Sequence, residues 1–379
     1  MPSIFSGIGS ANPIIGVFVG NTKQIVRSGR SLPHYGPVAS LCRALNATAY
    51  IFSPQDIDYR KHQINGIAFD RKRGQWIRKK YPFPHILYLQ GGLEKLDPKE
   101  LARFQLAVKS SKIRPVSSPL EFNKWEVYRI LYSRSSLRPY LPETKLFRSA
   151  AADLEPMLKR YGAVYLKACR GRRGEQVMRL ALLPDKAYHC CYFNEKPVAS
   201  RLKNFSQAVE TIQAFFRRRG FVVQQPIDLI EYKGKKVDLR AEMQRNGEGA
   251  LEILGIPVRV ALENSPITTH ALSYRFEKFF LEMMGYNEAA LQDLRSRLNS
   301  LLYRIYQSLE SRYGPLGEMG IDIGLDKKGN LWVIECNALS AMVSLGNAYE
   351  EKTVLRAFGN ALDYALYKHR QNTAEKYKN

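Results

Sequence analysis

The first part of the chain alternates between short, continuous apolar runs and one stripe of apolar residues at helical spacing. The runs at 14–19 and 49–53 predict buried strands. Between them, helical spacing predicts a helix with four residues on one stripe: Val38, Leu41, Cys42 and Leu45. The segment 66–79 predicts a hairpin, and 85–89 predicts another strand. Because this strand–helix–strand order is typical of α/β folds, we predict an N-terminal α/β domain over 1–115.

The rest of the chain continues to mix strands and helices, without an internal repeat. Strands are predicted at about 144–147, 163–169, 176–183, 221–225, 237–244 and 250–261. Helices are predicted at about 122–132, 151–160, 205–219, 274–284, 288–312 and 347–369. We divide this part into two further domains, 116–226 and 227–379.

The most informative pattern is a second predicted hairpin, over 320–337, where two alternating strands flank a turn at Lys328-Gly329. If those residues form the centre of the turn, three cross-strand pairs follow: Lys327 with Asn330, Leu325 with Trp332, and Asp322 with Glu335. Because side chains alternate between the faces of a sheet, one face is expected to be apolar. Its members are Ile321, Ile323, Leu325, Trp332, Ile334 and Cys336.

The opposite face of this hairpin brings together groups that can hold a cation. It carries two acids, an amide and two glycines: Gly320, Asp322, Gly324, Glu335 and Asn337. We expect the glycines to leave room for a ligand, and oxygen ligands of this kind suit Mg²⁺ bound with a nucleotide phosphate. Two alternatives stay open: the face is merely solvated, or a one-residue slip in register separates the two acids.

The charge of the chain is its one unusual bulk property. The 379 residues are 45% apolar and 25% charged, which is ordinary, but the formal net charge is +23. Such a charge favours anionic partners, including nucleotides and anionic polymers. The basic residues form short, scattered clusters at 71–73, 78–80, 170–173, 217–219 and 233–236. Without an accompanying nucleic-acid motif they indicate a generally basic surface, so we expect no nucleic-acid partner.

The cysteines and the hydropathy pattern indicate the cellular location in which the protein is expected. Five cysteines occur without the spacing of a disulfide framework or a zinc site: Cys42, Cys169, Cys190, Cys191 and Cys336. The sequence His189-Cys190-Cys191 is better explained as a buried or edge strand, because adjacent strand residues point to opposite faces. Neither a signal-peptide pattern nor a run of about 18 apolar residues occurs. We therefore expect no membrane span and a cytoplasmic location.

The predicted strand that ends at Lys167 leads into a glycine- and arginine-rich loop, and together they form a suitable phosphate-binding device. The lysine supplies a charge, and the glycines let backbone N–H groups approach an anion. The P-loop pattern is absent. Lys167 alone is weak evidence, but it is followed in order by the segments 224–227, 238–240 and 322–337. This order of basic strand, glycine loop, hinge and acidic hairpin resembles the ATP-grasp fold.

A narrower resemblance rests on segments spread over nearly the whole chain. They are 14–19, 76–85, 123–125, 141–144, 237–240, 319–323 and 332–337. Individually modest and jointly specific, they are similar to the YheC/YheD family, ATP-grasp proteins of spore-forming bacteria that are associated with the endospore coat. The resemblance implies an α/β (α+β) protein, with the ATP-grasp fold preceded by an N-terminal α/β pre-ATP-grasp-like domain.

The resemblance also implies which residues bind the nucleotide. Two lysines, Lys124 and Lys167, would contact the ATP phosphates, and Gly171 and Gly174 belong to the glycine loop. Backbone groups would form the adenine hinge at Gln224, Gln225 and Ile227. The residue proposed for the ribose hydroxyls is Glu231.

The same resemblance assigns the chemistry of the hairpin and of the neighbouring strands. Mg²⁺ would be held by Asp322, Glu335 and Asn337. Arg240 and Arg259 would face the transferred phosphoryl group or an acyl phosphate, and a surface or ion-pair role is the alternative for each.

The activity that follows is an ATP- and Mg²⁺-dependent ligase acting on an unidentified carboxylate through an acyl phosphate. The alternative is a non-catalytic coat component. The expected location is the cytoplasm of the mother cell, or the spore coat, where coat proteins or anionic polymers would be partners.

The chain departs from the family pattern mainly on the acceptor side. The stretch 263–274 lacks the paired glycines of relatives, and 88–90 reads Tyr-Leu-Gln in place of the usual Tyr-Asn-Arg. The segment 338–340 replaces a Pro-Gly that usually follows the metal-binding asparagine, and the glycine loop at 171–174 is short. The resemblance therefore supports nucleotide binding more strongly than any particular substrate.

Overall fold

The computed structural model describes residues 13–22, 48–70, 72–73, 75–93, 96–117, 119, 121–171, 176–194, 196–262, 272–340 and 342–376. The chain forms two compact units, and we describe each by itself. One comprises 1–117, 244–252 and 354–379, and the other comprises 118–243 and 253–353. The three domains expected from the sequence stay a prediction.

The first unit is built on a mixed sheet in the order β3-β4-β2-β1-β6-β7, with β5 paired to β4. Its strands are β1 (Ile14–Phe18), β2 (Thr48–Phe52), β3 (Ile57–Asp58), β4 (Gln63–Asp70), β5 (Gln75–Pro82), β6 (Ile86–Leu89) and β7 (Arg114–Pro115). Strand β1 runs parallel to β2 and β6, whereas β4 and β5 form an antiparallel hairpin. The predicted strands and hairpin are confirmed; the helix expected at 38–45 lies outside the described residues.

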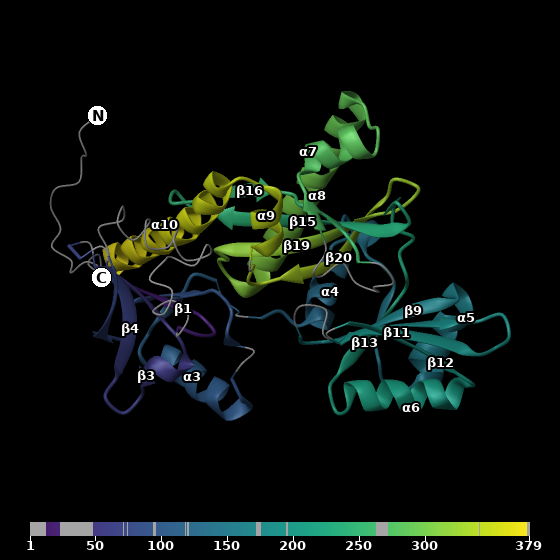
Figure 1. Ribbon diagram of the computed structural model, residues 1–379, viewed down its shortest axis with the longest axis horizontal. Helices are drawn as coiled ribbons and strands as arrows, with labels where there is room; N and C mark the ends of the chain where they lie inside the picture. Colours follow the sequence, from purple (N-terminus) through teal and green to yellow (C-terminus); the bar gives the residue numbers. More distant parts are fainter. Residues whose placement is uncertain are drawn as a thin grey trace. The chain divides into compact units, whose positions relative to one another are not determined.

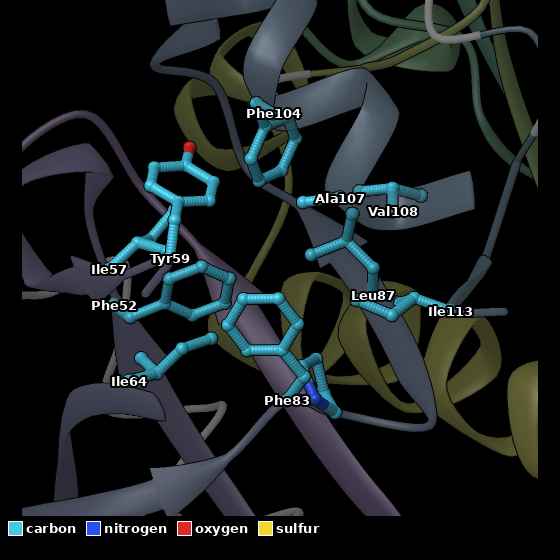
Figure 2. A pocket seen from close by; sticks show the side chains of 11 residues that line it. Phe52, Ile57, Tyr59, Ile64, Phe83, Leu87, Phe104, Ala107, Val108 and Ile113 are labelled. Atoms are coloured by element: carbon cyan, nitrogen blue, oxygen red, sulfur yellow. The ribbon is translucent and has the colours of Figure 1, made fainter. Parts of the chain in front are cut away.

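Helix α3 (Pro98–Ser110) begins at a capping box, because the Asp97 side chain accepts hydrogen bonds from the N–H groups of Lys99 and Glu100. The helix packs apolar side chains toward β2 and β6. Figure 2 shows Phe104 of the helix lying over Phe52 and Leu87 of the sheet, around a small pocket lined by apolar side chains. The pocket is thus part of the packing between helix and sheet.

The C-terminal helix α10 (Glu351–Lys376), yellow in Figure 1, belongs to the core of the first unit. Its Phe358 and Leu362 are buried in the same apolar cluster as Ile15 and Tyr88. The single helix expected at 347–369 was wrong in its start. Two helices occur, α9 (Val343–Ala348) and α10, because the backbone of Tyr349 is extended between them.

The second unit contains a six-stranded antiparallel sheet in the order β12-β11-β10-β9-β13-β8. Its strands are β8 (Thr144–Leu146), β9 (Ala163–Ala168), β10 (Val177–Leu182), β11 (Tyr188–Asn194), β12 (Lys196–Leu202) and β13 (Phe221–Gln224). Helix α6 (Phe205–Phe216) runs along one face of this sheet (Figure 1), with Ile212 packed in the same cluster as Leu166. Alternation then places Lys167 on the other face. The predicted strand with His189 is the interior strand β11.

Further helical elements of this unit come before the six-stranded sheet or beside it. They are α4 (Lys124–Tyr132), the 3₁₀ turn η3 (Arg138–Tyr140), the π-helical turn η4 (Ala150–Leu154) and α5 (Glu155–Tyr161). Helices α4 and α5 correspond to the helices predicted at 122–132 and 151–160, with later starts. Asn123 caps the N-terminus of α4, because its side chain accepts from the N–H groups of Trp125 and Glu126.

A second sheet has the order β18-β17-β15-β19-β20, and β14 and β16 also pair with β15. Its strands are β14 (Glu231–Tyr232), β15 (Lys235–Arg245), β16 (Leu251–Gly255), β17 (Val258–Val260), β18 (Leu272–Tyr274), β19 (Glu318–Leu325) and β20 (Leu331–Asn337). The strand expected at 250–261 is broken at Ile256-Pro257 into β16 and β17. The helical part comprises α7 (Phe276–Lys278), the π-helical turn η5 (Phe279–Met283) and α8 (Glu288–Tyr313). Within the described chain, no helix combines the length and apolar character that crossing a bilayer requires.

Candidate functional site

The acidic hairpin is formed by β19 and β20, and its register confirms the pairing of Asp322 with Glu335. The turn is one residue longer than expected, because Asp326 donates its N–H to Asn330 O and Gly329 takes a left-handed backbone. A β-bulge between Asp322 and Ile323 then leaves Ile334 as an extra residue on β20. The two irregularities cancel, so the acids are direct neighbours on one face.

Because of the longer turn and the bulge, two residues of β20 lie on a different face from the one expected. Leu325 pairs with Leu331, and Gly324 pairs with Trp332. Trp332 therefore lies on the face of Gly324 rather than with the core, and its indole N–H donates to Asp326 at 2.9 Å. A Cβ on Gly324 would lie 3.4 Å from the side chain of Ile334, so Ile334 also belongs to this face. The expectation that both lie on the apolar face was wrong; Leu331 and Val333 lie there and are buried.

The expectation that the two glycines leave room for a ligand was also wrong. A Cβ on Gly320 would overlap the guanidinium group of Arg240, and a Cβ on Gly324 would lie 2.6 Å from Leu229. Glycine is needed at both positions because side chains of the protein itself pass closely over the backbone. The space above the hairpin is therefore shaped by Arg240 and Leu229.

Two arginines neutralise Asp322. Its Oδ1 lies 2.9 Å from an amino nitrogen of Arg240 and 3.1 Å from one of Arg259. Burial by itself would raise the pKa of Asp322, but Arg259 and Arg240 outweigh burial and hold the pKa below its usual value. Arg259 also forms a bidentate pair with Asp238, its cross-strand neighbour, at 2.7 and 2.6 Å.

Arg240 is held from several sides. Its Nε lies 3.1 Å from Glu242, and a second nitrogen lies 3.4 Å from the hydroxyl of Ser340. With its amide oriented to satisfy both neighbours, Asn337 accepts from Arg240 at 3.0 Å and donates to Glu335 at 3.1 Å. Burial raises the pKa of Glu242 more than Arg240 lowers it. The ion-pair role left open for both arginines is thus present in this arrangement.

Glu335 connects the hairpin to the start of α4. Its Oε1 lies 3.3 Å from Lys124 Nζ, and Lys124 also donates to the carbonyl oxygen of Gly171 at 3.0 Å. The backbone N–H of Lys124 bonds Cys169 O at 2.8 Å, so the start of the helix is attached to the strand that carries Lys167. Lys124 therefore lies between the glycine loop and the acidic hairpin. Gly174 lies outside the described residues.

Lys167 is buried and has no ion pair within 4.0 Å among the described residues. Its Nζ donates to Gln224 Oε1 at 2.7 Å and lies 3.4 Å from the carbonyl oxygen of the bulged residue Ile334. Burial lowers the pKa of Lys167 to about 8, and the more distant Glu335 only partly opposes this. Gln224 is fixed in turn by donating to Thr144 Oγ1 at 3.0 Å.

The remaining expected nucleotide ligands lie at the end of β13 and beyond it. The backbone N–H of Gln225 donates to Glu143 O at 2.9 Å, and Ile227 O accepts from Leu229. Glu231 is exposed on β14, 3.6 Å from Lys327 Nζ. The roles of these three residues in adenine and ribose binding stay predictions.

The donor set of the hairpin fits a hard cation. In the described chain, no three His, Cys, Asp or Glu side chains gather into a metal cluster, so an oxygen site here needs the amide of Asn337 beside Asp322 and Glu335. Each of these side chains contacts a cationic side chain through one oxygen: Arg240 and Arg259 contact Asp322, Lys124 contacts Glu335, and Arg240 contacts Asn337. Two carboxylates and an amide suit Mg²⁺, with the arginines and Lys124 as competing charges.

Sequence reasoning missed several residues that support the site. The carboxylates of Asp238 and Glu242 hold the two arginines, and Thr144 and Ser340 complete the polar contacts. A signal was available for the carboxylates, because 238, 240 and 242 alternate along β15 and so share a face. No local pattern indicated Thr144, which contacts a residue 80 positions away.

The sequence of the YheC/D-like ATP-grasp family matches residues 112–367. The chain belongs to this family. Endospore coat-associated protein YheD of Bacillus subtilis (strain 168) is 26% identical over 339 residues, which cover 86% of this chain and 72% of that protein. Endospore coat-associated protein YheC of the same strain is 22% identical over 292 residues, covering 76% and 79%.

The fold is also found in solved ATP-grasp structures. The D-alanine–D-alanine ligase from Coxiella burnetii has a TM-score of 0.54 at 11% identity, and the match covers 97% of this chain and 99% of that one. At this identity the likeness concerns the fold alone. The α/β ATP-grasp architecture expected from the sequence is confirmed.

Proposed function

We propose that this ATP-grasp protein is an ATP- and Mg²⁺-dependent ligase that activates a carboxylate substrate as an acyl phosphate. The observation that carries the proposal is the pairing of Asp322 with Glu335 across the hairpin, next to the buried Lys167. Acidic oxygens and a buried lysine are the two halves of a site for a metal-bound triphosphate.

The residues of this chain would divide the work as follows. Lys124 and Lys167 would bind the phosphates, and Arg240 and Arg259 would face the transferred phosphoryl group. Backbone groups at 224–227 would bind adenine, and Glu231 would bind the ribose. Each cation lies in a polar cluster that fixes its position before the ligand arrives, which favours charge stabilisation without costly reorganisation.

The reaction has two steps. A carboxylate oxygen of the substrate attacks the γ-phosphorus of ATP while the bond to the β-phosphate oxygen breaks, giving an acyl phosphate and ADP. An amine or similar nucleophile then attacks the acyl carbon, phosphate leaves, and the nucleophile loses its proton. Mg²⁺ bound by Asp322, Glu335 and Asn337 would neutralise phosphate charge. Arg240 and Arg259 would stabilise the charge that develops on the phosphoryl oxygens.

A second candidate function is a non-catalytic coat component that keeps the fold. The contact of Arg240 with Ser340 favours this candidate. Ser340 lies in the segment 338–340, which departs from the family pattern, and its hydroxyl takes up one of the hydrogen-bond donors of Arg240. The names of YheD and YheC associate those proteins with the endospore coat. We extend this association to the present chain as a proposal, with the mother-cell cytoplasm as the other proposed location.

Calorimetry of Mg·ATP binding tests the proposal, with Lys167→Ala and Glu335→Ala as variants. We expect magnesium-dependent binding to the wild type and a loss of at least about tenfold in each variant, since each removes a charge-assisted contact. Unchanged affinity in Glu335→Ala would contradict the assigned metal site. ADP release on addition of carboxylates then separates the ligase from the non-catalytic coat component.

A further inference from the structure

Helix α6 ends in a turn that carries three consecutive arginines, Arg217 to Arg219. The N–H of Arg219 bonds Phe216 O at 3.0 Å, which closes a four-residue turn. Arg217 has φ 53° and ψ −119°, the backbone of the first central residue of a type II′ turn. This position normally takes glycine, because a Cβ is strained there. A strained backbone that carries a long cationic side chain favours a role for that side chain.

The turn adjoins the start of the glycine loop. The carbonyl oxygen of Gly220 accepts from Cys169 N at 2.8 Å, and Phe221 pairs with Ala168. The chain continues from Cys169 into Arg170 and Gly171. Gly171 O accepts from Lys124 Nζ, so hydrogen bonds join the arginine turn to the region proposed to bind phosphates.

The cations of this surface greatly outnumber its acids. Arg217, Arg218 and Arg219 are exposed, and none of them forms an ion pair within 4.0 Å in the described part of the chain. The side chain of Arg170 is 60% exposed and lies 3.7 Å from Glu121. Glu121 also accepts from the N–H of Gly171 at 3.1 Å, so its charge is already shared. Among the described residues, Glu121 is the one carboxylate within 4.0 Å of any of these four guanidinium groups, so the surface is strongly positive.

We propose that Arg170 and Arg217–Arg219 bind the acceptor of the reaction, and that the acceptor is an acidic peptide bearing several carboxylates. This inference rests on the ligase function proposed above. In such a substrate one carboxylate reacts, while others remain to be held beside the phosphates. Guanidinium groups match carboxylates in a planar, two-bond geometry, which an ammonium group does not.

The chain offers a matched control at Lys186, in the turn between β10 and β11. Lys186 is also exposed with a positive φ, 63°. It lies at the other end of the same sheet, because β10 pairs Val177 with Lys167 at the glycine-loop end and Ala181 with Ala163 at the far end. Replacing Arg217 or Lys186 by glycine removes one positive charge and relieves one strained backbone in each case.

The test is the binding of a fluorescently labelled hexaglutamate peptide to the full chain at low salt without nucleotide. We expect Arg217→Gly and Lys186→Gly each to raise Tm by about 2 °C, because backbone strain is relieved. Only Arg217→Gly should weaken hexaglutamate binding, by about fivefold, and the Arg218→Ala/Arg219→Ala double variant should weaken it further.

Equal hexaglutamate affinity of Arg217→Gly and Lys186→Gly would overturn the proposed surface. If Arg217→Gly weakens tripolyphosphate binding more than hexaglutamate binding, the assignment to a peptide bearing carboxylates is overturned. Mg·ATP binding, measured separately on the wild type, distinguishes the two proposals. If it is intact while the variants do not differ, only this inference fails; if it is absent, the ligase function fails and the acceptor assignment fails with it.

Discussion

The two sheets of the second unit differ in how their buried charged side chains are neutralised. On the sheet with β15, β17 and β19, Asp322 lies between Arg240 and Arg259, and its pKa stays below the usual value although it is buried. On the six-stranded sheet, Lys167 bonds the neutral oxygens of Gln224 and Ile334, and its pKa falls to about 8. The first cluster is thus compensated within the protein, whereas Lys167 has no ion pair within 4.0 Å among the residues that the structure describes. Under the function proposed above, a nucleotide phosphate would supply the missing anion.

The largest effect is expected from breaking the compensated cluster. Arg259→Met leaves Asp238 and Asp322 without a shared cation, and both are buried. We expect the free energy of unfolding to fall by about 3–5 kcal/mol in urea denaturation. The control is Lys159→Met, which removes an exposed pair with Glu155 at 2.6 Å and should cost at most about 0.5 kcal/mol. Similar losses in both variants would show that the buried cluster is not special.

A smaller loss of stability is expected at Gly320, where the guanidinium group of Arg240 lies against the backbone of β19. Gly320→Ala places a methyl group against the guanidinium of Arg240, which Asp322 and Glu242 hold in place. We expect a loss of about 1–3 kcal/mol in unfolding free energy, together with weaker Mg·ATP binding. Gly220→Ala is the control, because the nearest atom to its new Cβ, Cys169 Sγ, lies 3.8 Å away. Equal stability of the two variants would argue against this close contact.

Because Lys167 is buried without an ion pair among the described residues, we expect the affinity for Mg·ATP to depend on pH. Because the pKa of Lys167 is lowered to about 8, the side chain is charged at pH 7 and mostly neutral at pH 9. If binding needs the charged form, the Kd for Mg·ATP should rise about tenfold between these pH values. Lys167→Met should bind more weakly at pH 7 and lose the inflection near pH 8. A wild-type Kd that does not change over this range would contradict the assigned role of Lys167.

The smallest effect is expected from the polar contact behind Lys167. Thr144→Val keeps the shape of the side chain but removes the hydroxyl that accepts from Gln224 Nε2 at 3.0 Å. We expect unfolding to be easier by about 1 kcal/mol, because a buried donor loses its partner. Thr211→Val, which removes a hydroxyl bonded to Gln207 O on α6, should cost less. A reversed order in thermal or urea denaturation would show that the Thr144–Gln224 contact is unimportant.

The hairpin shows where sequence reasoning succeeded and where it failed. Alternation placed Asp322 and Glu335 on one face, and the register confirms it. Trp332 and Ile334 were expected on the apolar face and lie on the other one, because neither the longer turn nor the compensating bulge is visible in the alternation. Both errors were single-residue shifts. Because side chains alternate with a period of two residues, each such shift moves a side chain to the opposite face.

From the sequence alone we could predict the family, the order of most strands and helices, and the presence of paired acids on one hairpin face. These features depend on alternation, turn residues and segments of adjacent residues, which are local properties of the chain. The three-dimensional structure was needed to show that Arg240, rather than a ligand, covers Gly320, and that two arginines neutralise Asp322. Arg240 and Asp322 are 82 residues apart, and no local pattern encodes which distant side chains meet at a buried charge.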